Sequence, residues 1–276
     1  MSSRIKTILI IGATSGIGEA FARRFHGLGK KVIATGRNQE KLKGLAQELP
    51  GLEARQLFID DIGALAHHVA AILSEFPTLD TVIITAGIQH CFSLLDASTT
   101  KAEEMASEIT TNLTAPTVLV HHLAPHLMKL AESGTKTTLF LTSSTLAYIP
   151  LSFYPSYCAS KAGVAALTKV LRQQLGFASD MAKRNMAVVE IVPPYTDTTL
   201  DKAHREATIS MQGGVEKAFL PMPLHQYVDG FFAEWEQAVL PDGSVKQEIG
   251  LGMGQLAVDT WRESFGRLYE PMGIST

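Results

Sequence analysis

The sequence of 276 residues predicts an α/β fold in which helices cover both faces of one parallel sheet. Three observations predict this fold. Short apolar runs of strand length recur along the chain, they lack the polar alternation of a half-exposed strand, and amphipathic stretches of helical length separate them. A strand that is apolar on both sides must be buried on both sides, and helical crossovers connect parallel strands.

The order of these segments predicts a doubly wound sheet of about seven strands. The expected strands lie at 8–11, 31–34, 54–58, 81–84, 138–141, 188–192 and 248–251. The expected helices lie near 17–28, 38–48, 62–76, 101–131, 156–178 and 223–238. Mixed polar residues, a Gly-Gly pair and two prolines indicate that the chain leaves the sheet between about 197 and 222. No repeat or linker divides the chain, so we expect one domain over residues 1–276.

Composition narrows the class of protein. Hydrophobic residues make up 46% of the chain, enough for a large core, and the net charge of -3 does not favour nucleic-acid binding or an acidic membrane surface. The nine histidines are scattered, so we expect no metal. The N-terminal sequence lacks the apolar run of a signal peptide, no apolar stretch is long enough to span a membrane, and Ile274–Thr276 matches no retention or peroxisomal tail. With only Cys91 and Cys158, the chain is expected to be a reduced, cytoplasmic protein.

A glycine turn follows the first predicted strand. Its sequence is Gly12-Ala-Thr-Ser-Gly16-Ile-Gly18, and a helix is expected to start within it. Glycines let the backbone approach phosphate oxygens, and the free amides of a helix N-terminus attract them. A glycine turn alone can also serve simple chain reversal. Its place directly after a buried strand favours a dinucleotide site, with contacts expected from Gly12, Thr14, Ser15, Gly16, Ile17 and Gly18.

A phenol and an ammonium group are expected on one face of the helix near 156–178. Tyr157 and Lys161 are four residues apart, so they lie one turn from each other. A nearby ammonium lowers the pKa of a phenol from about 10 and lets it exchange protons near neutral pH. Each residue alone has a common structural explanation. Their combination with the glycine turn points to hydride transfer at a carbonyl or alcohol.

The spacing Gly-x-x-x-Gly-x-Gly, with Ser144, Tyr157 and Lys161, resembles the classical short-chain dehydrogenase/reductase family from Ile5 to about Leu251. The resemblance implies a Rossmann-type fold. It further implies that Ser144, thirteen residues before Tyr157, donates to the substrate oxygen and that Tyr157 is the acid or base. Lys161 would lower the pKa of Tyr157 and bind the nicotinamide ribose, and Asn112 matches the asparagine that holds a relay water.

The end of the second strand is where this family selects its cofactor. No acid stands there to repel a 2′-phosphate, and Arg37, followed by Asn38, offers a charged fork to bind one. We therefore expect NADP(H) over NAD(H), although Arg37 could also be a solvated side chain. The resemblance places either Asp60 or Asp61 beside the adenine and leaves the choice open.

Two further turns resemble family motifs. Thr85-Ala86-Gly87 is similar to the family's Asn-Asn-Ala-Gly turn, with threonine in place of the second asparagine. The stretch from Pro193 to Thr198 is similar to the Pro-Gly-x-x-x-Thr turn beside the nicotinamide, in a Pro-Pro variant found in members related to the DltE branch. These turns add Ala86, Gly87, Pro193 and Thr198 to the expected cofactor contacts, which also include Asn112, Tyr157 and Lys161.

Mostly apolar residues are expected to line the substrate mouth, which favours a hydrophobic carbonyl or alcohol substrate. They are His90, Leu146, Ile149, Phe153, Tyr154, Tyr195 and the segment 197–222. The helices near 101–131 and 156–178 are the family's usual subunit contacts, so a homodimer or homotetramer is expected, although the small residues of the second helix could equally face the sheet. A non-catalytic NADP(H) sensor is the alternative function. An epimerase or dehydratase of the extended family is disfavoured because its glycine spacing and longer C-terminal domain are missing.

Overall fold

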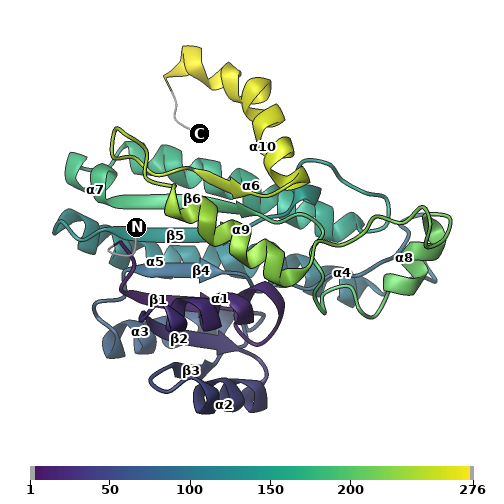
Figure 1. Cartoon of the computed structure of the whole chain (residues 1–276), viewed down its shortest axis with the longest axis horizontal. Helices are drawn as coiled ribbons and strands as arrows, with labels where there is room; N and C mark the ends of the chain where they lie inside the picture. Colours follow the sequence, from purple (N-terminus) through teal and green to yellow (C-terminus); the bar gives the residue numbers. More distant parts are fainter. Residues whose placement is uncertain (1–3, 274–276) are drawn as a thin grey trace.

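The computed structural model describes residues 4–273. The expectations about N-terminal and C-terminal targeting signals also concern residues 1–3 and 274–276, which lie outside this range. Seven parallel strands form one sheet (Figure 1). In chain order they are β1 (Thr7–Ile11), β2 (Lys31–Gly36), β3 (Glu53–Gln56), β4 (Thr81–Ile84), β5 (Thr137–Thr142), β6 (Met186–Val192) and β7 (Glu248–Gly250). The predicted doubly wound parallel sheet is therefore confirmed.

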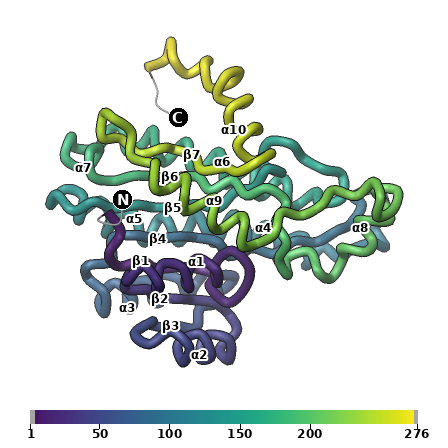
Figure 2. The backbone as a smooth tube through the Cα atoms, viewed as in Figure 1, coloured from purple at the N-terminus to yellow at the C-terminus, as the bar shows by residue number. Residues whose placement is uncertain are grey.

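The strand order in the sheet is β3-β2-β1-β4-β5-β6-β7. The chain moves outward from β1 in one direction, then crosses back to place β4 on the other side of β1 (Figure 2). In an open parallel sheet, ligands bind outside the carboxyl ends of the strands at such a reversal. The turns that follow β1 and β4 meet there, because the N–H groups of Thr85 and Ala86 both donate to Ile11 O at 2.9 Å.

Helices pack on both faces of the sheet because its central strands, such as β1 and β4, are buried on both sides. Along β1, Ile8 and Ile10 face one core layer, while Leu9 and Ile11 face the other. The first layer is closed by α1 (Gly16–Gly27), α2 (Gln39–Glu48) and α9 (Leu224–Glu236). The second is closed by α3 (Leu65–Glu75), α5 (Ala115–Glu132) and α6 (Pro155–Gly176).

The helix expected near 101–131 is interrupted. It consists of α4 (Ala102–Ile109), a π-helical turn (Thr110–Thr114) and α5. A π turn inserts an extra residue into the helical ladder and often marks a functional position. Pro116 is the second residue of α5, directly after this turn, and has no N–H to donate into the helical ladder. The turn contains Asn112, so the interruption falls on a predicted site residue.

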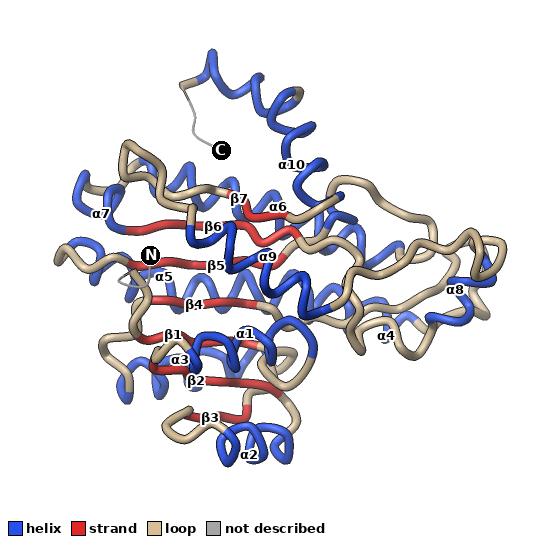
Figure 3. Tube along the Cα trace, viewed as in Figure 1, coloured by secondary structure: helices blue, strands red, loops and turns tan. Residues whose placement is uncertain are grey.

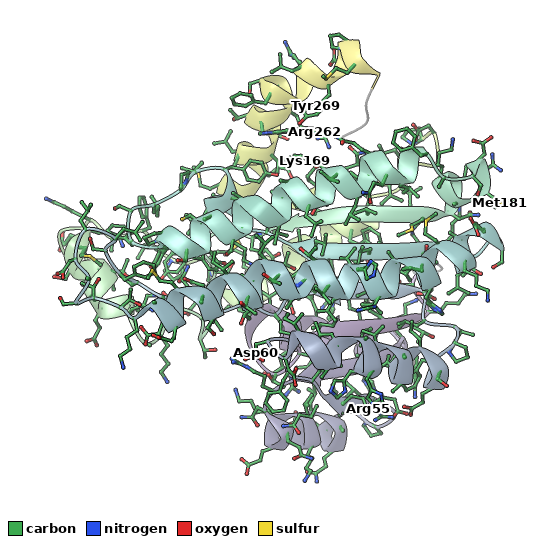
Figure 4. All side chains as sticks on the ribbon, turned by 180° about the vertical axis from the view of Figure 1, so that it is seen from behind. Arg55, Asp60, Lys169, Met181, Arg262 and Tyr269 are labelled. Carbon is green, nitrogen blue, oxygen red and sulfur yellow. The ribbon has the colours of Figure 1, made fainter. Side chains whose placement is uncertain are left out.

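Other helices were not expected from the sequence. The segment 197–222 leaves the sheet as predicted and carries the short α8 (Arg205–Met211), while α7 (Asp180–Asn185) leads into β6 (Figure 3). After β7, α10 (Met253–Glu263) and a 3₁₀ segment (Phe265–Met272) extend away from the sheet (Figure 1). Figure 4 shows Lys169 and Arg262 where α6 meets this C-terminal segment.

Candidate active site

Two adjoining cavities lie at the carboxyl ends of the strands. One is a groove of about 730 Å³ that begins at the glycine turn, and the other is a cavity of about 660 Å³ between the ends of β5 and β6 and the 197–222 segment. They share part of their walls. The shared residues are Ile17, Thr85, Gly87, Gln89, Thr198 and Leu200. A ligand can therefore extend from the groove into the cavity.

The groove is shaped by glycines that no other residue could replace without displacing its neighbours. Gly12 has φ +101°, and a Cβ there would lie 2.6 Å from the backbone nitrogen of Ala86. A Cβ on Gly18 would lie 2.2 Å from the carbonyl oxygen of Gly12. Close packing between the turn after β1, the start of α1 and the turn after β4 leaves room for a phosphate group against the backbone.

The start of α1 supplies donors to this groove. Gly12, Thr14, Ser15, Gly16, Ile17 and Gly18 all line it. Ser15 occupies the N-cap position, and its side chain makes no capping hydrogen bond. The first N–H groups of a helix lack intrahelical partners and carry the positive end of the helix dipole. The glycine cradle and these donors therefore fit the pyrophosphate of a dinucleotide.

The far end of the groove carries one predicted cation. Arg37 follows β2, lines the groove and is exposed. Within residues 4–273 its side chain makes no ion pair or hydrogen bond. Thr85, which lines both the groove and the cavity, donates a hydrogen bond from its side chain to Ile11 O at 3.0 Å.

The contacts predicted for Asn38 and for Asp60 or Asp61 are not found, because none of these residues lines either space. Asn38 instead caps α2 by accepting a hydrogen bond from Lys41 N at 2.9 Å, and Asp61 accepts one from Ala64 N at 3.3 Å. Asp60 is exposed and lies at the surface on the β3 side of the sheet (Figure 4). Because β3 ends at Gln56, two residues earlier than expected, the aspartates lie beyond the wall. Leu57 and Ile59 form that wall instead.

Ser144 and Tyr157 meet in the cavity. Ser144 follows β5, and its hydroxyl is close enough to the Tyr157 phenol to lower the pKa of that phenol. The hydroxyl also accepts a hydrogen bond from Leu146 N at 3.1 Å. The neighbouring Ser143 is turned away and donates to Glu190 Oε1 at 2.5 Å. The two serines that the sequence offers are thus engaged with different partners, and Ser144 is the one beside Tyr157.

Lys161 is buried one turn after Tyr157. Its Nζ donates to Thr142 O at 2.9 Å and lies 5.5 Å from the centroid of the Tyr157 ring. Burial lowers the pKa of Lys161 to about 8, and the charge of Glu108 opposes that shift. Contrary to the expectation from its proximity to Lys161, the pKa of Tyr157 is not lowered overall. Burial raises that pKa, because desolvation of the phenolate outweighs the opposing effect of the nearby Ser144 hydroxyl.

Asn112 lies behind the cavity rather than in its wall. Its Oδ1 accepts a hydrogen bond from Ile88 N at 2.9 Å, and its Nδ2 donates to Ile88 O at 2.8 Å. The side chain therefore connects the π turn to the loop that follows β4. A Cβ on Gly87 would lie 3.3 Å from Asn112 Oδ1 and 3.6 Å from Lys161 Nζ, so all three residues meet at one point.

The rest of the cavity wall is mainly apolar. It includes Leu146, Ile149, Phe153, Tyr154, Tyr195, Leu200, Ile209, Phe219, Leu220, Met222 and Met253. His90, expected at the substrate mouth, lines the groove instead, because the loop after β4 runs along that side. Pro193 lines the cavity, and Thr198 lines both spaces and packs against Gly16.

The two charged side chains of the 197–222 segment that line the cavity, Asp201 and Arg205, are paired with each other. Arg205 donates to Asp201 at 2.7 and 3.0 Å and to Asp197 at 2.9 Å. The Tyr195 hydroxyl donates to Asp201 at 2.6 Å. These contacts hold the segment in place over the cavity, and the Asp201–Arg205 pair in its wall carries no net charge. The arrangement favours an uncharged ligand next to Tyr157.

Three buried charged residues near the site were not predicted from the sequence. Glu108 on α4 is fully buried near Lys161, and Glu190 on β6 bonds Ser143 and pairs with Lys169 at 3.4 Å. Glu108 could have been found, because it stands one helical turn before Asn112 and so shares its inward face. The sequence pointed less clearly to Glu190, which is a single acidic residue within an otherwise apolar strand.

Comparison with known proteins identifies the family. Residues 6–209 match the short chain dehydrogenase family model. The uncharacterized oxidoreductase DltE of Bacillus subtilis is 30% identical over 269 residues, which is 96% of each chain. The serine 3-dehydrogenase of Agrobacterium fabrum is 34% identical over 214 residues, covering 77% of this chain and 78% of that one. The protein belongs to the short-chain dehydrogenase family and is an oxidoreductase.

Solved structures share the fold. A short-chain dehydrogenase from Sphingobium yanoikuyae in complex with NADPH superimposes with a TM-score of 0.74 at 24% identity, covering 95% of both chains. A short-chain dehydrogenase/reductase from Burkholderia phymatum in complex with NAD gives a TM-score of 0.76 at 19% identity, covering 97% of this chain and 96% of that one. Both nicotinamide dinucleotides thus occur in proteins of this shape.

Residues 4–273 lack two further features. No helix in this range is both long and apolar enough to cross a membrane. The same residues contain no cluster of three or more histidine, cysteine or acidic side chains suited to a metal ion.

Proposed function

We propose that the protein is an NADP(H)-dependent carbonyl reductase, or alcohol dehydrogenase in the reverse direction, acting on an uncharged, hydrophobic substrate. One observation carries the proposal. Ser144, Tyr157 and Lys161 lie together in an apolar cavity that continues into a glycine-walled groove. A bound nicotinamide cofactor would supply or accept the hydride, and the three side chains would handle the proton and the substrate oxygen.

The proposed roles follow from the chemistry of each side chain. The Ser144 hydroxyl would bind the substrate oxygen and stabilise the charge that develops on it. Tyr157 is a neutral phenol near neutral pH because burial raises its pKa, so it is suited to donate a proton to that oxygen. The Lys161 ammonium would make the resulting phenolate less costly. Asn112 would hold the π turn and the loop after β4 in register with Lys161.

The groove would bind the dinucleotide at two places, the pyrophosphate and the 2′-phosphate. Gly12, Ser15 and the first amides of α1 would bind the pyrophosphate, and Arg37 would bind the 2′-phosphate of NADP(H). Arg37 supports the choice of NADP(H) because its guanidinium lines the groove with no acidic partner in residues 4–273. Leu57 and Ile59, rather than Asp60 or Asp61, would border the adenine.

Assembly, location and domain structure form part of the proposal. We infer one domain, because a single sheet carries both cavities. A homo-oligomer is supported by the outer face of α6, where Ala162, Ala166 and Val170 are exposed. A reducing compartment such as the cytoplasm is supported by two free cysteines.

Consumption of NADPH by the purified protein tests this function. A panel of hydrophobic ketones, aldehydes and quinones is assayed with the wild type and Tyr157→Phe. Loss of the proton donor should lower turnover by a factor of about 10² to 10⁴, with NADPH binding preserved. Tyr269→Phe, a change of the same kind on the distant C-terminal segment, should leave turnover unchanged. Tight NADPH binding with no turnover on any compound would instead favour the sensor function.

A further inference from the structure

Glu108 is a buried acid that the proposed reaction does not yet use. Its side chain lies in the last turn of α4 and is 0% exposed. Oε1 accepts a hydrogen bond from His90 N at 2.9 Å. Oε2 is buried and has no hydrogen-bond partner within residues 4–273. A carboxyl group buried in this way is costly, so its retention calls for a reason.

The surroundings of Glu108 lead to Lys161. Helix α4 packs against α6 and the π turn. The titratable groups that face Glu108 are Lys161, Tyr157 and Cys158 from α6 and His90 from the loop after β4. On α4 itself, Glu104 is exposed and bonded to Thr100 and Lys101. Lys161 is therefore the cation that acts on Glu108.

Glu108 in turn acts on the charge of Lys161. This ammonium is buried, and its Nζ donates one hydrogen bond within residues 4–273, to the neutral carbonyl of Thr142. Glu108 supplies the negative charge that raises its pKa against burial. A buried ammonium without a counter-charge tends to lose its proton. Without Glu108, Lys161 would be uncharged over more of the neutral pH range.

We propose that Glu108 is a positioning residue of the active site, whose carboxylate keeps Lys161 in the ammonium form that the reaction needs. The inference rests on the proposed function, because that function assigns the ammonium its role beside Tyr157. It also makes Glu108 distinct from Asn112, one turn away, which holds the backbone and carries no charge.

The sign of the pH effect follows from the two groups. Burial raises the pKa of Glu108 to about 7, so the carboxylate forms as the pH rises through that value. Lys161, with a pKa of about 8, loses its proton at higher pH. Both groups are therefore charged mainly between these two values. Removing the carboxylate lowers the pKa of Lys161, so the loss of activity at alkaline pH should begin at a lower pH.

Glu108→Gln tests this because the amide oxygen can still accept the hydrogen bond from His90 while the charge is removed. For NADPH-dependent reduction, the alkaline limb of the kcat profile should move down by about one pH unit. Glu108→Asp, which keeps the charge, should restore most of the profile. Glu132→Gln, the same change at the exposed end of α5, should not move it. An unchanged profile in Glu108→Gln would refute the proposal.

Two readouts need no substrate. With ¹³C-labelled glutamate carboxyls, the wild type should show one signal that titrates near neutral pH and is missing in Glu108→Gln. If every glutamate titrates below about 5, the proposal is wrong. If no substrate is turned over, the pH profile of NADPH affinity is measured in place of the pH profile of kcat. A lower alkaline midpoint in Glu108→Gln then supports the role of Glu108 while the reductase function fails, and an unchanged midpoint refutes that role.

Discussion

At the scale of single residues, Arg37 should decide between the two nicotinamide dinucleotides. It is the cation at the end of the groove next to β2, and a guanidinium binds phosphate through charge-assisted hydrogen bonds worth about 1.5–3 kcal/mol. Arg37→Ala should therefore weaken NADPH binding by a factor of about 10 to 100 and leave NADH binding nearly unchanged. Fluorescence titration with each cofactor measures both constants.

Lys43→Ala is the matched control for this change. It removes one positive charge from the exposed face of α2, close in sequence but outside the groove. Equal losses of NADPH affinity in both variants would mean that only the overall charge matters. Equal affinities of the wild type for NADPH and NADH would contradict the proposed preference.

The sequence was enough to predict that Ser144, Tyr157 and Lys161 lie together. Ser144 follows a strand, Tyr157 and Lys161 are one helical turn apart, and all three line the cavity at one edge of the sheet. The sequence was not enough for the pKa of Tyr157. That value depends on how much water reaches the phenol, and burial is produced by segments distant in sequence, including the 197–222 excursion.

At the scale of the secondary-structure element, two glycines of α1 differ in whether a larger side chain can replace them. A Cβ on Gly18 would lie 2.2 Å from the Gly12 carbonyl oxygen, whereas a Cβ on Gly27 in the same helix would meet no atom within 4 Å. Gly18→Ala should therefore push α1 away from the glycine turn. We expect a loss of stability of about 1–3 kcal/mol and a strong loss of dinucleotide binding.

Gly27→Ala provides the comparison within that helix. It should be neutral or stabilise by up to about 1 kcal/mol, because alanine is the better helix former. Urea unfolding and NADPH titration of both variants give the two quantities. Normal NADPH affinity in Gly18→Ala would show that the packing at the start of α1 does not shape the site.

The interrupted helix shows where element prediction stops. Hydrophobic periodicity predicted one helix over 101–131, because the apolar pattern continues from α4 through the π turn into α5 without a visible break. The π turn is stabilised by contacts outside the helix, namely the two hydrogen bonds between Asn112 and Ile88. A local pattern carries no information on those partners. The position of Asn112 was predictable from the sequence, but its backbone conformation was not.

At the scale of the whole molecule, the outer face of α6 should mediate self-association. Ala162, Ala166 and Val170 recur every four residues and are exposed, while Ala165 faces the core. A long charged side chain at Ala166 would prevent close helix packing. Ala166→Arg should therefore shift the sedimentation coefficient from that of a dimer or tetramer to that of a monomer.

Ala71→Arg, on the exposed face of α3 on the same side of the sheet, should leave the assembly intact. A wild-type protein that sediments as a monomer at all concentrations would contradict the proposed oligomer. Dissociation in both variants would place the contact elsewhere on this side of the molecule.

The sequence by itself determined the sheet, its helices on both faces, the family and the side chains at the carboxyl edge. These follow from local apolar periodicity and from fixed spacings, which act over a few residues. Tertiary structure alone decided that Asp60 and Asp61 lie outside the groove, that His90 lines it, and that Glu108 is buried near Lys161. Burial and charge pairing depend on elements that meet only in the folded chain. The electrostatics of the candidate site therefore had to come from the structure.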